Sequence, residues 1–524
     1  MSALVERLVE FIAGPIQLRE LRATFRGYRF MIILTSALAL ALFVIWVSSF
    51  AMELDGMAPS DIGQATFLIL LTIQFGLIGL LLPGFAGTSI VRERDQGTLE
   101  LLSTTTLRPW QIIWGQLAAS LGYVTVMLFA TLPLMAIPFW FGGLSGWEPL
   151  LAGAGLFSFA ILVAMWSILY SALSNSLARA VILSYLMVFF GAGPVLSILM
   201  EMIDDTFRGR GVFSGLLRFL TEHRLLIAID AAWALVVPFV FMFIIAVNRL
   251  KPPGANRATP VRIFSVIFVP ASSALFLYNA WFFLHDGWMP VRHMATFAWW
   301  AFAAVMASAV TLQFVDGPAS GIRQLRLLER LRGFRRPLRL FAPGGRRGLA
   351  LIVPVAAATL AGGGWLAMRL LAWDADDGDL AFRLMLGCAA AQFLYAAGVA
   401  SFIGGLRIST MLGRVAWLVA VLGLPVFTLL WMAASYQGLP PDNIPLARHV
   451  PGYLCLPWVM FTVWDGTFGT GQIPMIQGAV PVWVPCLIFH IGLGLLFMTL
   501  GSVLEHGAER REFEELAQRN PAAP

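Results

Sequence analysis

The stretch TFLILLTIQFGLIGLLLPGFAGT, residues 66–88, decides the fold class, because it is apolar almost throughout. A helix needs about 20 such residues to cross the hydrocarbon core of a bilayer. A strand of an outer-membrane barrel would instead alternate apolar and polar residues over about ten positions. The stretch is therefore predicted to be a transmembrane helix.

The whole chain has the same character. Of its 524 residues, 59% are hydrophobic and 12% are charged, whereas a soluble domain carries about 25% charged residues. The 40 Phe and 18 Trp residues exclude a disordered chain, because so much apolar surface does not stay solvated. These values exclude a soluble enzyme and predict an all-α polytopic membrane protein.

Apolar runs of similar length predict about 12 transmembrane helices. They lie near 30–50, 66–88, 111–137, 149–172, 178–200, 226–248, 263–284, 294–314, 350–371, 381–405, 415–434 and 484–503. Arginines gather in alternate loops, and the bias of Lys and Arg toward cytoplasmic loops then places both termini in the cytoplasm. The loop 201–225 is the exception, since it carries several arginines although the count places it outside.

The order of loops suggests two six-helix halves. We predict a cytoplasmic interfacial helix, a first half, a second half and a cytoplasmic tail, at 1–29, 30–260, 261–503 and 504–524. The second half contains a basic cytoplasmic loop at 315–349 and an external segment at 435–483, which either re-enters the membrane or lies at its surface. Twelve unrelated spans stay open as the alternative, because only the loop pattern supports a repeat.

The N-terminal segment carries an apolar stripe beside a basic stripe at helical spacing. The basic stripe consists of Arg19, Arg22, Arg26 and Arg29, and the apolar one of Leu18, Leu21, Phe25 and Tyr28. This pattern is typical of a helix in the cytoplasmic interface, with its arginines among the phosphates of anionic lipids. A charge cluster that only sets the topology is the alternative.

The loop 88–110 has the sequence signals of a short helix between two long ones. A charged cluster at 92–95 precedes Gly97, which can break a helix, and Thr98, a candidate N-cap. Leu99, Leu101 and Leu102 then form an apolar face with Glu100 in the first turn, and Pro109 begins the next span. We interpret this short helix as a lever between two spans; a lipid-facing amphipathic connector is the alternative.

The same residues carry a family resemblance. The run RERDQGTLELLSTTTLRPWQIIWGQ resembles the E-R-E-x-G-T-L-E-x-L-L-x-T-P-L motif of permease subunits in type 2 ATP-binding-cassette (ABC) exporters, and GPIQLRELRATFRGYRF looks like the first helix of that family. The matches cover about the first 120 residues, with Asp95, Ser103 and Thr106 as departures. The resemblance implies an ATPase-coupling loop formed by Arg92, Glu93, Arg94, Gly97, Thr98, Leu99, Glu100, Leu101 and Leu102.

The chain lacks a P-loop of its own. A P-loop needs a lysine followed by Ser or Thr, whereas Lys251, the one lysine of the chain, is followed by Pro252. We therefore expect no cofactor in this chain, and ATP with Mg²⁺ on a separate ATPase subunit. The loop 315–349 is either a second coupling element or an anchor for anionic lipids. The translocation path accordingly lies in a homodimer or in a pseudo-dimer within one chain.

These expectations define a multi-pass exporter subunit of the bacterial cytoplasmic (inner) membrane, not an enzyme, with no catalytic residue, no metal ligand and no nucleic-acid partner. The resemblance implies drugs, lipids, polysaccharides or peptides as substrates. An ion-coupled carrier is the alternative, but no ionisable residue is predicted near a membrane midplane except His490, which we interpret as a packing residue. A polytopic transferase is less favoured; its best catalytic candidates are His285, Asp286, Arg292 and His293, with Arg448 and His449 elsewhere.

Two features of the predicted spans are also open to test. Gln111, Gln116 and Gln392 are predicted to form hydrogen bonds between helices. The span 381–405 is rich in Gly and Ala, which favours either close packing of two helices or the lining of a translocation path.

Overall fold

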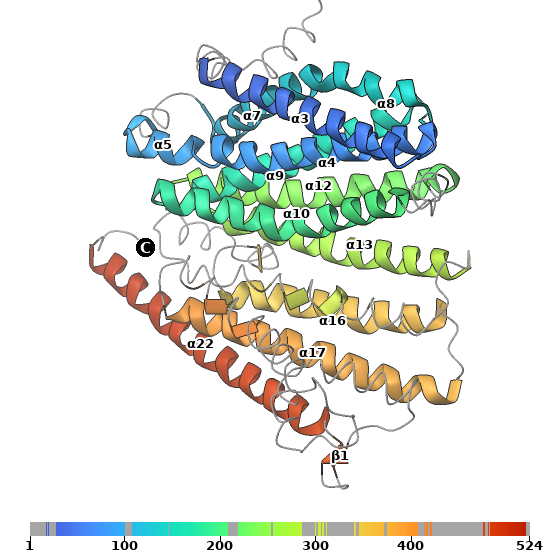
Figure 1. The fold of residues 1–524 in the computed structure, drawn as a ribbon. Coiled ribbons are helices and arrows are strands. Elements are labelled where there is room, and N and C mark those ends of the chain that lie inside the picture. The colour runs from blue at the N-terminus through green and yellow to red at the C-terminus, as the bar shows by residue number, and fades with distance from the viewer. Residues whose placement is uncertain are drawn as a thin grey trace, which may run out of the picture. The chain divides into compact units, whose positions relative to one another are not determined.

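A computed structural model gives the fold of the chain (Figure 1). The structure describes residues 17, 19, 28–99, 107–144, 146–207, 218, 220–252, 255–285, 299, 302–304, 307–308, 311, 340–341, 345–370, 375–406, 413, 416–417, 420–421, 475–476, 480–481 and 483–519. The predicted spans 294–314 and 415–434 lie largely outside these residues. Every other predicted span overlaps a helix, and the span 111–137 runs from one long helix through a 3-10 turn into a second, short helix.

The chain divides into two compact units, Met1–Lys251 and Pro252–Pro524. The sequence-based division after residue 260 places the lead-in to the next helix in the first half, whereas the contacts place it in the second unit. Whether the two units are six-helix repeats stays a prediction.

The described part of the first unit consists mainly of long helices. These are α3 (Tyr28–Leu54), α4 (Pro59–Ala86), α7 (Pro109–Thr131), α9 (Glu148–Leu173), α10 (Leu177–Phe207) and α12 (Arg224–Leu250), with the short elements α5 (Ser89–Asp95), η1 (Leu132–Met135) and α8 (Ala136–Phe141). Pro59 and Pro109 stand in the first turns of α4 and α7, where the missing proline N–H removes no intrahelical bond.

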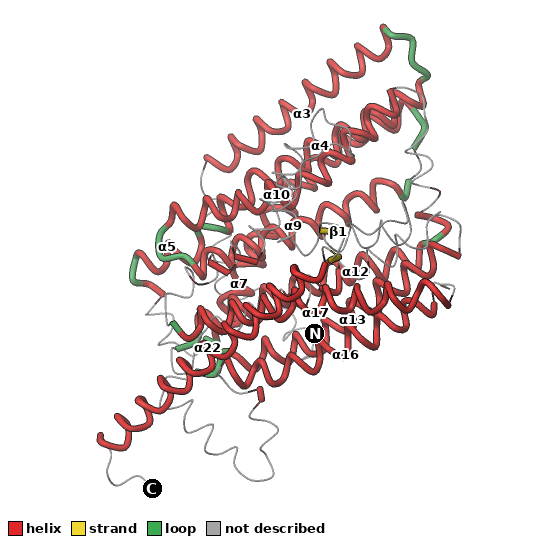
Figure 2. Tube along the Cα trace, turned by 90° about the horizontal axis from the view of Figure 1, so that it is seen from below, coloured by secondary structure: helices red, strands yellow, loops and turns green. Residues whose placement is uncertain are grey.

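Helix α9 forms the centre of this unit. It packs against α4, α7, α10, α12 and α5, and its Ala160, Ala164 and Ile168 are fully buried. Figure 2 shows the neighbouring pair α4 and α10 side by side. Small side chains let helices approach closely, which matters in lipid because apolar burial alone gives little drive for association there.

Polar side chains add bonds between helices of the first unit. Gln74 on α4 donates to the hydroxyl of Thr131 on α7 over 2.7 Å, and both residues are buried. The hydroxyls of Ser49 and Thr66 lie 3.3 Å apart between α3 and α4. Such bonds satisfy polar groups that hydrocarbon cannot solvate.

The second unit contains α13 (Ala258–His285), α16 (Gly345–Leu370), α17 (Ala375–Gly405) and α22 (Trp483–Arg519). Asn256 precedes α13 and caps its first turn, since its side-chain oxygen accepts from the backbone N–H groups of Ala258 and Thr259, each at 3.2 Å. The strands β1 (Met475–Ile476) and β2 (Val480–Pro481) form a two-residue antiparallel pair inside the predicted external segment 435–483.

Helices α17 and α22 pack through their backbones. A Cβ added at Gly494 would lie 2.7 Å from the carbonyl oxygen of Leu394, and a Cβ added at Gly398 would clash with the carbonyl oxygen of Gly494. The small residues of α17 therefore serve close packing against α22, which was one of the two roles expected for the span 381–405.

Among the described residues, nine helices are long and apolar enough to cross a membrane. On α3 the large apolar side chains of Phe43 and Trp46 are 61% and 65% exposed, as expected for a helix that faces lipid. The chain is an all-α polytopic membrane protein. The full count of 12 spans and the cytoplasmic placement of both termini stay predictions.

Two helices extend beyond their predicted spans. Helix α22 continues to Arg519, so most of the predicted tail 504–524 is helical, supported by an i,i+4 ion pair between Arg510 and Glu514. Helix α16 begins at Gly345, inside the predicted loop 315–349, most of which lies outside the described residues. Hydropathy misses such extensions because charged helical turns lack an apolar signal.

Candidate functional site

The candidate site is the region where α4 ends and α5 begins. The backbone N–H of Gly87 donates to the carbonyl of Pro83 over 2.9 Å, and the hydroxyl of Thr88 donates to the carbonyl of Gly84 over 3.0 Å. A Cβ at Gly87 would lie 2.9 Å from the hydroxyl of Ser184 on α10. The chain thus turns out of α4 in close contact with α10.

Helix α5 is fixed to the end of α9 by a serine. The hydroxyl oxygen of Ser171 accepts from the backbone N–H groups of Ile90 and Val91, at 3.0 and 3.1 Å. The first N–H groups of a helix have no partner within it, so an acceptor from a neighbouring helix satisfies them. All three residues are fully buried, which makes this contact part of the core.

Arg94 binds the turn between α9 and α10. Its guanidinium donates to the carbonyl of Ala172 over 3.0 Å, to the carbonyl of Ser174, and to the side chain of Asn175 over 3.5 Å. The last carbonyls of a helix lack intrahelical donors, and a cation is favoured at that end of the helix dipole. Helix α5 is therefore bound at two points to one end of α9.

Glu93 connects α5 to the N-terminal segment through an ion pair with Arg19. The Glu93 side chain is 8% exposed, whereas that of Arg19 is 51% exposed. Of the predicted basic stripe, Arg22 and Arg26 lie outside the described residues, and Arg29 is described only as part of α3. The ion pair brings a residue of the predicted interfacial helix to the predicted coupling loop.

Gly97 ends this part of the loop with a φ of +71°, a conformation that favours glycine. The predicted break at this position is confirmed. Thr98 is already helical rather than the residue before the helix, and its hydroxyl donates to the carbonyl of Glu93 over 3.0 Å. Leu99 packs on the core of the first unit.

The remaining predicted coupling residues have different outcomes. Arg92 is exposed on α5. Glu100, Leu101 and Leu102 lie outside the described residues. Pro109 begins α7 as predicted.

The three glutamines that were predicted to bond between helices have different outcomes. The side-chain oxygen of Gln111 accepts from the backbone N–H of Arg108 over 2.8 Å, so this residue caps its own helix, contrary to the prediction. Gln116 is buried and Gln392 half-buried, and their predicted bonds stay untested. The buried glutamine that does join two helices, Gln74, was not singled out from the sequence.

The histidine at 490 packs in the core of the second unit. Its Nδ1 lies 2.9 Å from the carbonyl of Cys486, one turn earlier, and its ring meets that of Tyr395 edge to face. His490 is 3% exposed, which agrees with the predicted packing role.

The remaining candidates for catalysis lie largely outside the described residues. These are Asp286, Arg292, His293, Arg448 and His449, together with the side chain of His285. Within the part of the chain that is described, no three His, Cys, Asp or Glu side chains gather in a way that would hold a metal ion.

Comparisons with known proteins give no relative for this chain: no family model, no curated protein and no solved structure matches it.

Proposed function

We propose that the chain is the membrane-spanning permease subunit of an ABC-type exporter in the bacterial inner membrane. A separate ATPase subunit, carrying ATP and Mg²⁺, would bind the loop 88–110 and supply the energy. The observation that carries this proposal is the attachment of α5 to the α9–α10 turn through Arg94 and Ser171.

The attachment supports a mechanical role for the loop. Helix α5 follows α4 after a two-residue turn, and its bonds reach the end of α9, the central helix of the first unit. A force applied to α5 is therefore applied to α4 and α9 together. Packed helices of this kind move as rigid elements, as alternating access requires.

The Arg19–Glu93 ion pair supports a second connection. In the proposal, the N-terminal segment lies on anionic lipid and holds α5 through Arg19. Arg19 is half exposed whereas Glu93 is buried, so the pair gives the buried carboxylate an opposite charge and would position α5 against the N-terminal segment.

Co-purification in mild detergent from the native host tests the partner. We expect a nucleotide-binding protein to accompany the chain, and Arg92→Glu, an exposed change on α5, to reduce its recovery about tenfold or more, a loss of roughly 1.4 kcal/mol. Arg224→Glu, at the exposed start of α12, is the matched control and should keep the partner. Transport that survives without any ATPase and collapses with an ion gradient would establish the carrier alternative instead.

The ion pair gives a second, finer test of the proposal. Glu93→Gln and Arg19→Ala should each lower transport per ATP hydrolysed, and the double variant should be no worse than either, because both remove one interaction. Glu514→Gln, a change of an exposed acid on α22, should leave this ratio unchanged. Additive losses would show that the two residues act separately.

A further inference from the structure

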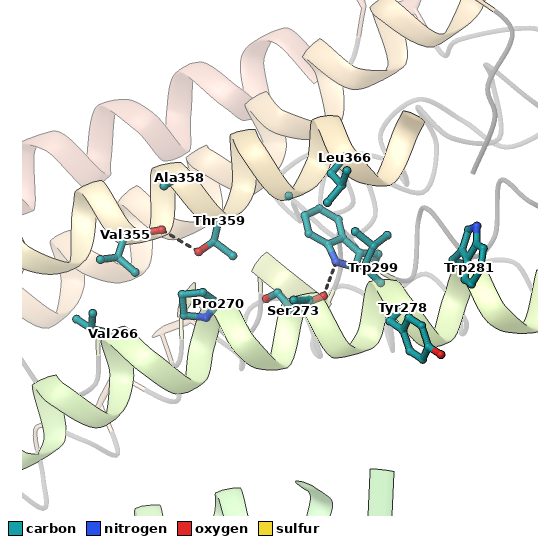
Figure 3. A pocket seen from close by; sticks show the side chains of 13 residues that line it. Val266, Pro270, Ser273, Tyr278, Trp281, Trp299, Val355, Ala358, Thr359 and Leu366 are labelled. Carbon is teal, nitrogen blue, oxygen red and sulfur yellow. Dashed lines mark hydrogen bonds between the residues drawn. The ribbon is translucent and has the colours of Figure 1, made fainter. Parts of the chain in front are cut away.

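The second unit contains a pocket of about 690 Å³ between α13 and α16 (Figure 3). The two helices run in the same direction along it, with Val266 near Val355 at one end and Tyr278 toward Leu366 at the other. Tyr278 and Leu366 are 49% and 43% exposed, so the pocket opens to the outside of the helix pair. Its size is within the range of about 300–1,000 Å³ typical of sites for drug-sized molecules.

The pocket wall is apolar apart from a few groups, of which Ser273 is the most informative. This residue is 2% exposed, and its hydroxyl has no hydrogen-bond partner among the described residues. Ser265, another buried serine on α13, instead donates to the carbonyl of Val261 over 2.9 Å. A buried hydroxyl without a partner costs free energy, which a ligand that bonds to it would recover.

Pro270 adds a second polar group to the same wall. Because proline has no N–H, the carbonyl of Val266, one turn earlier, lacks its usual helical donor. Val266, Pro270 and Ser273 all line the pocket. The pocket is therefore lined by a residue with an unpartnered hydroxyl and, about two helical turns earlier, by one whose carbonyl lacks its helical N–H donor.

Trp299 forms one wall of the pocket, and its ring is held in place by a hydrogen bond. Its indole N–H donates to the carbonyl of Ser273 over 2.9 Å, and the side chain is 1% exposed. A Cβ added at Gly363 on α16 would lie 2.7 Å from its ring, so the indole packs directly on the backbone of that helix. An aromatic wall held in this way provides a preformed surface for an apolar ligand.

We propose that this pocket binds an apolar amphiphile of drug size that carries a hydroxyl or a similar hydrogen-bonding group, and that the molecule enters from the lipid. The polar group would contact Ser273, while the apolar body lies against Trp299 and Tyr278. Ser273 stands near the middle of α13, a candidate membrane span, at the depth of the hydrocarbon core. The ester groups of phospholipids stay at the membrane surface, so a lipid tail at this depth would leave the hydroxyl without a partner.

Photolabelling of the full chain in lipid nanodiscs tests the site. The probes are dodecanol carrying a diazirine and the matching diazirine alkane without the hydroxyl. We expect the alcohol to label peptides from α13 and α16 more efficiently than the alkane. Ser273→Ala should lower alcohol labelling about threefold to tenfold, the effect of one hydrogen bond, and should leave alkane labelling unchanged.

Matched variants separate binding from damage to the fold. Ser265→Ala removes a buried hydroxyl that already has a partner, and should not change the preference for the alcohol. Ala358→Trp places a large ring in the pocket and should abolish labelling, whereas Ala357→Trp, at the neighbouring exposed position outside the lining, should not. Equal labelling by alcohol and alkane, or an unchanged signal in Ala358→Trp, would overturn the proposal and indicate a site filled by lipid tails. No ATPase is needed for this assay, so its outcome is independent of the proposed export function.

Discussion

Two helix contacts in this chain are built in opposite ways. Helix α5 is held to α9 by two kinds of hydrogen bond: the hydroxyl of Ser171 accepts from backbone N–H groups of α5, and Arg94 donates to backbone carbonyls at the end of α9. Helix α17 is held to α22 by direct contact of backbones at Gly398 and Gly494. The first contact can be broken by losing a few bonds, whereas the second tolerates almost no change in distance. The α5–α9 contact therefore depends on single side chains, whereas the α17–α22 contact depends on the absence of side chains.

Gly494→Ala should give the largest effect, because the new Cβ would lie 2.7 Å from the backbone of Leu394. We expect a loss of about 3 kcal/mol in stability, at the upper end of the usual range for overpacking, because the clash is with backbone atoms that cannot move aside. Gly492→Ala on the same helix is the control, as a Cβ there meets no atom within 4 Å. Thermal unfolding in detergent measures both, and equal melting temperatures would refute the close contact.

Arg94→Ala should give an intermediate effect, a loss of about 2 kcal/mol, because bonds from a charged donor to two carbonyls disappear. Its exposed neighbour Arg92 provides the control, and Arg92→Ala should stay within about 0.5 kcal/mol of the parent. If the amides of residues 172–175 exchange faster in Arg94→Ala but not in Arg92→Ala, the loss of stability arises at the α9–α10 turn. If both variants unfold at the same temperature, Arg94 does not anchor α5.

Ser171→Ala should give the smallest effect, about 1 kcal/mol, comparable to the loss of a helix cap. Ser167, one turn earlier on α9, provides the control. Its hydroxyl donates to the carbonyl of Val163 over 2.7 Å, which is a bond within α9. Hydrogen exchange at the amides of Ile90 and Val91 should therefore increase in Ser171→Ala but not in Ser167→Ala. An increase in both would mean that α9 as a whole, rather than one hydroxyl, controls α5.

Local chemistry made part of this structure predictable. The apolar runs predicted the helices, Gly97 predicted the break after α5, and Pro109 predicted the start of α7. Each of these signals determines the backbone conformation of the residues that carry it. The wrong prediction for Gln111 has the same origin: a glutamine in the first turn of a helix has a nearby backbone N–H to accept from.

The long-range contacts of the candidate site had no such signal. Arg94 meets carbonyls about 80 positions further along the chain, and Arg19 meets Glu93 across 74 positions. A serine such as Ser171 looks like any other serine in an apolar run. Likewise, the small residues of α17 gain a definite role only once Gly494 of α22 is known to face them.

The length of α22 has a consequence beyond packing. Its 37 residues make a rod of about 55 Å, while the hydrocarbon core is about 30 Å thick. The candidate span ends at Ala508, and the exposed Arg510, Arg511 and Glu514 continue the helix into water. A fluorescent or enzymatic reporter fused after this rod would be held clear of the lipid surface, on a stiff spacer. A reporter in this position is therefore suited to determine which side of the membrane the end of α22 occupies.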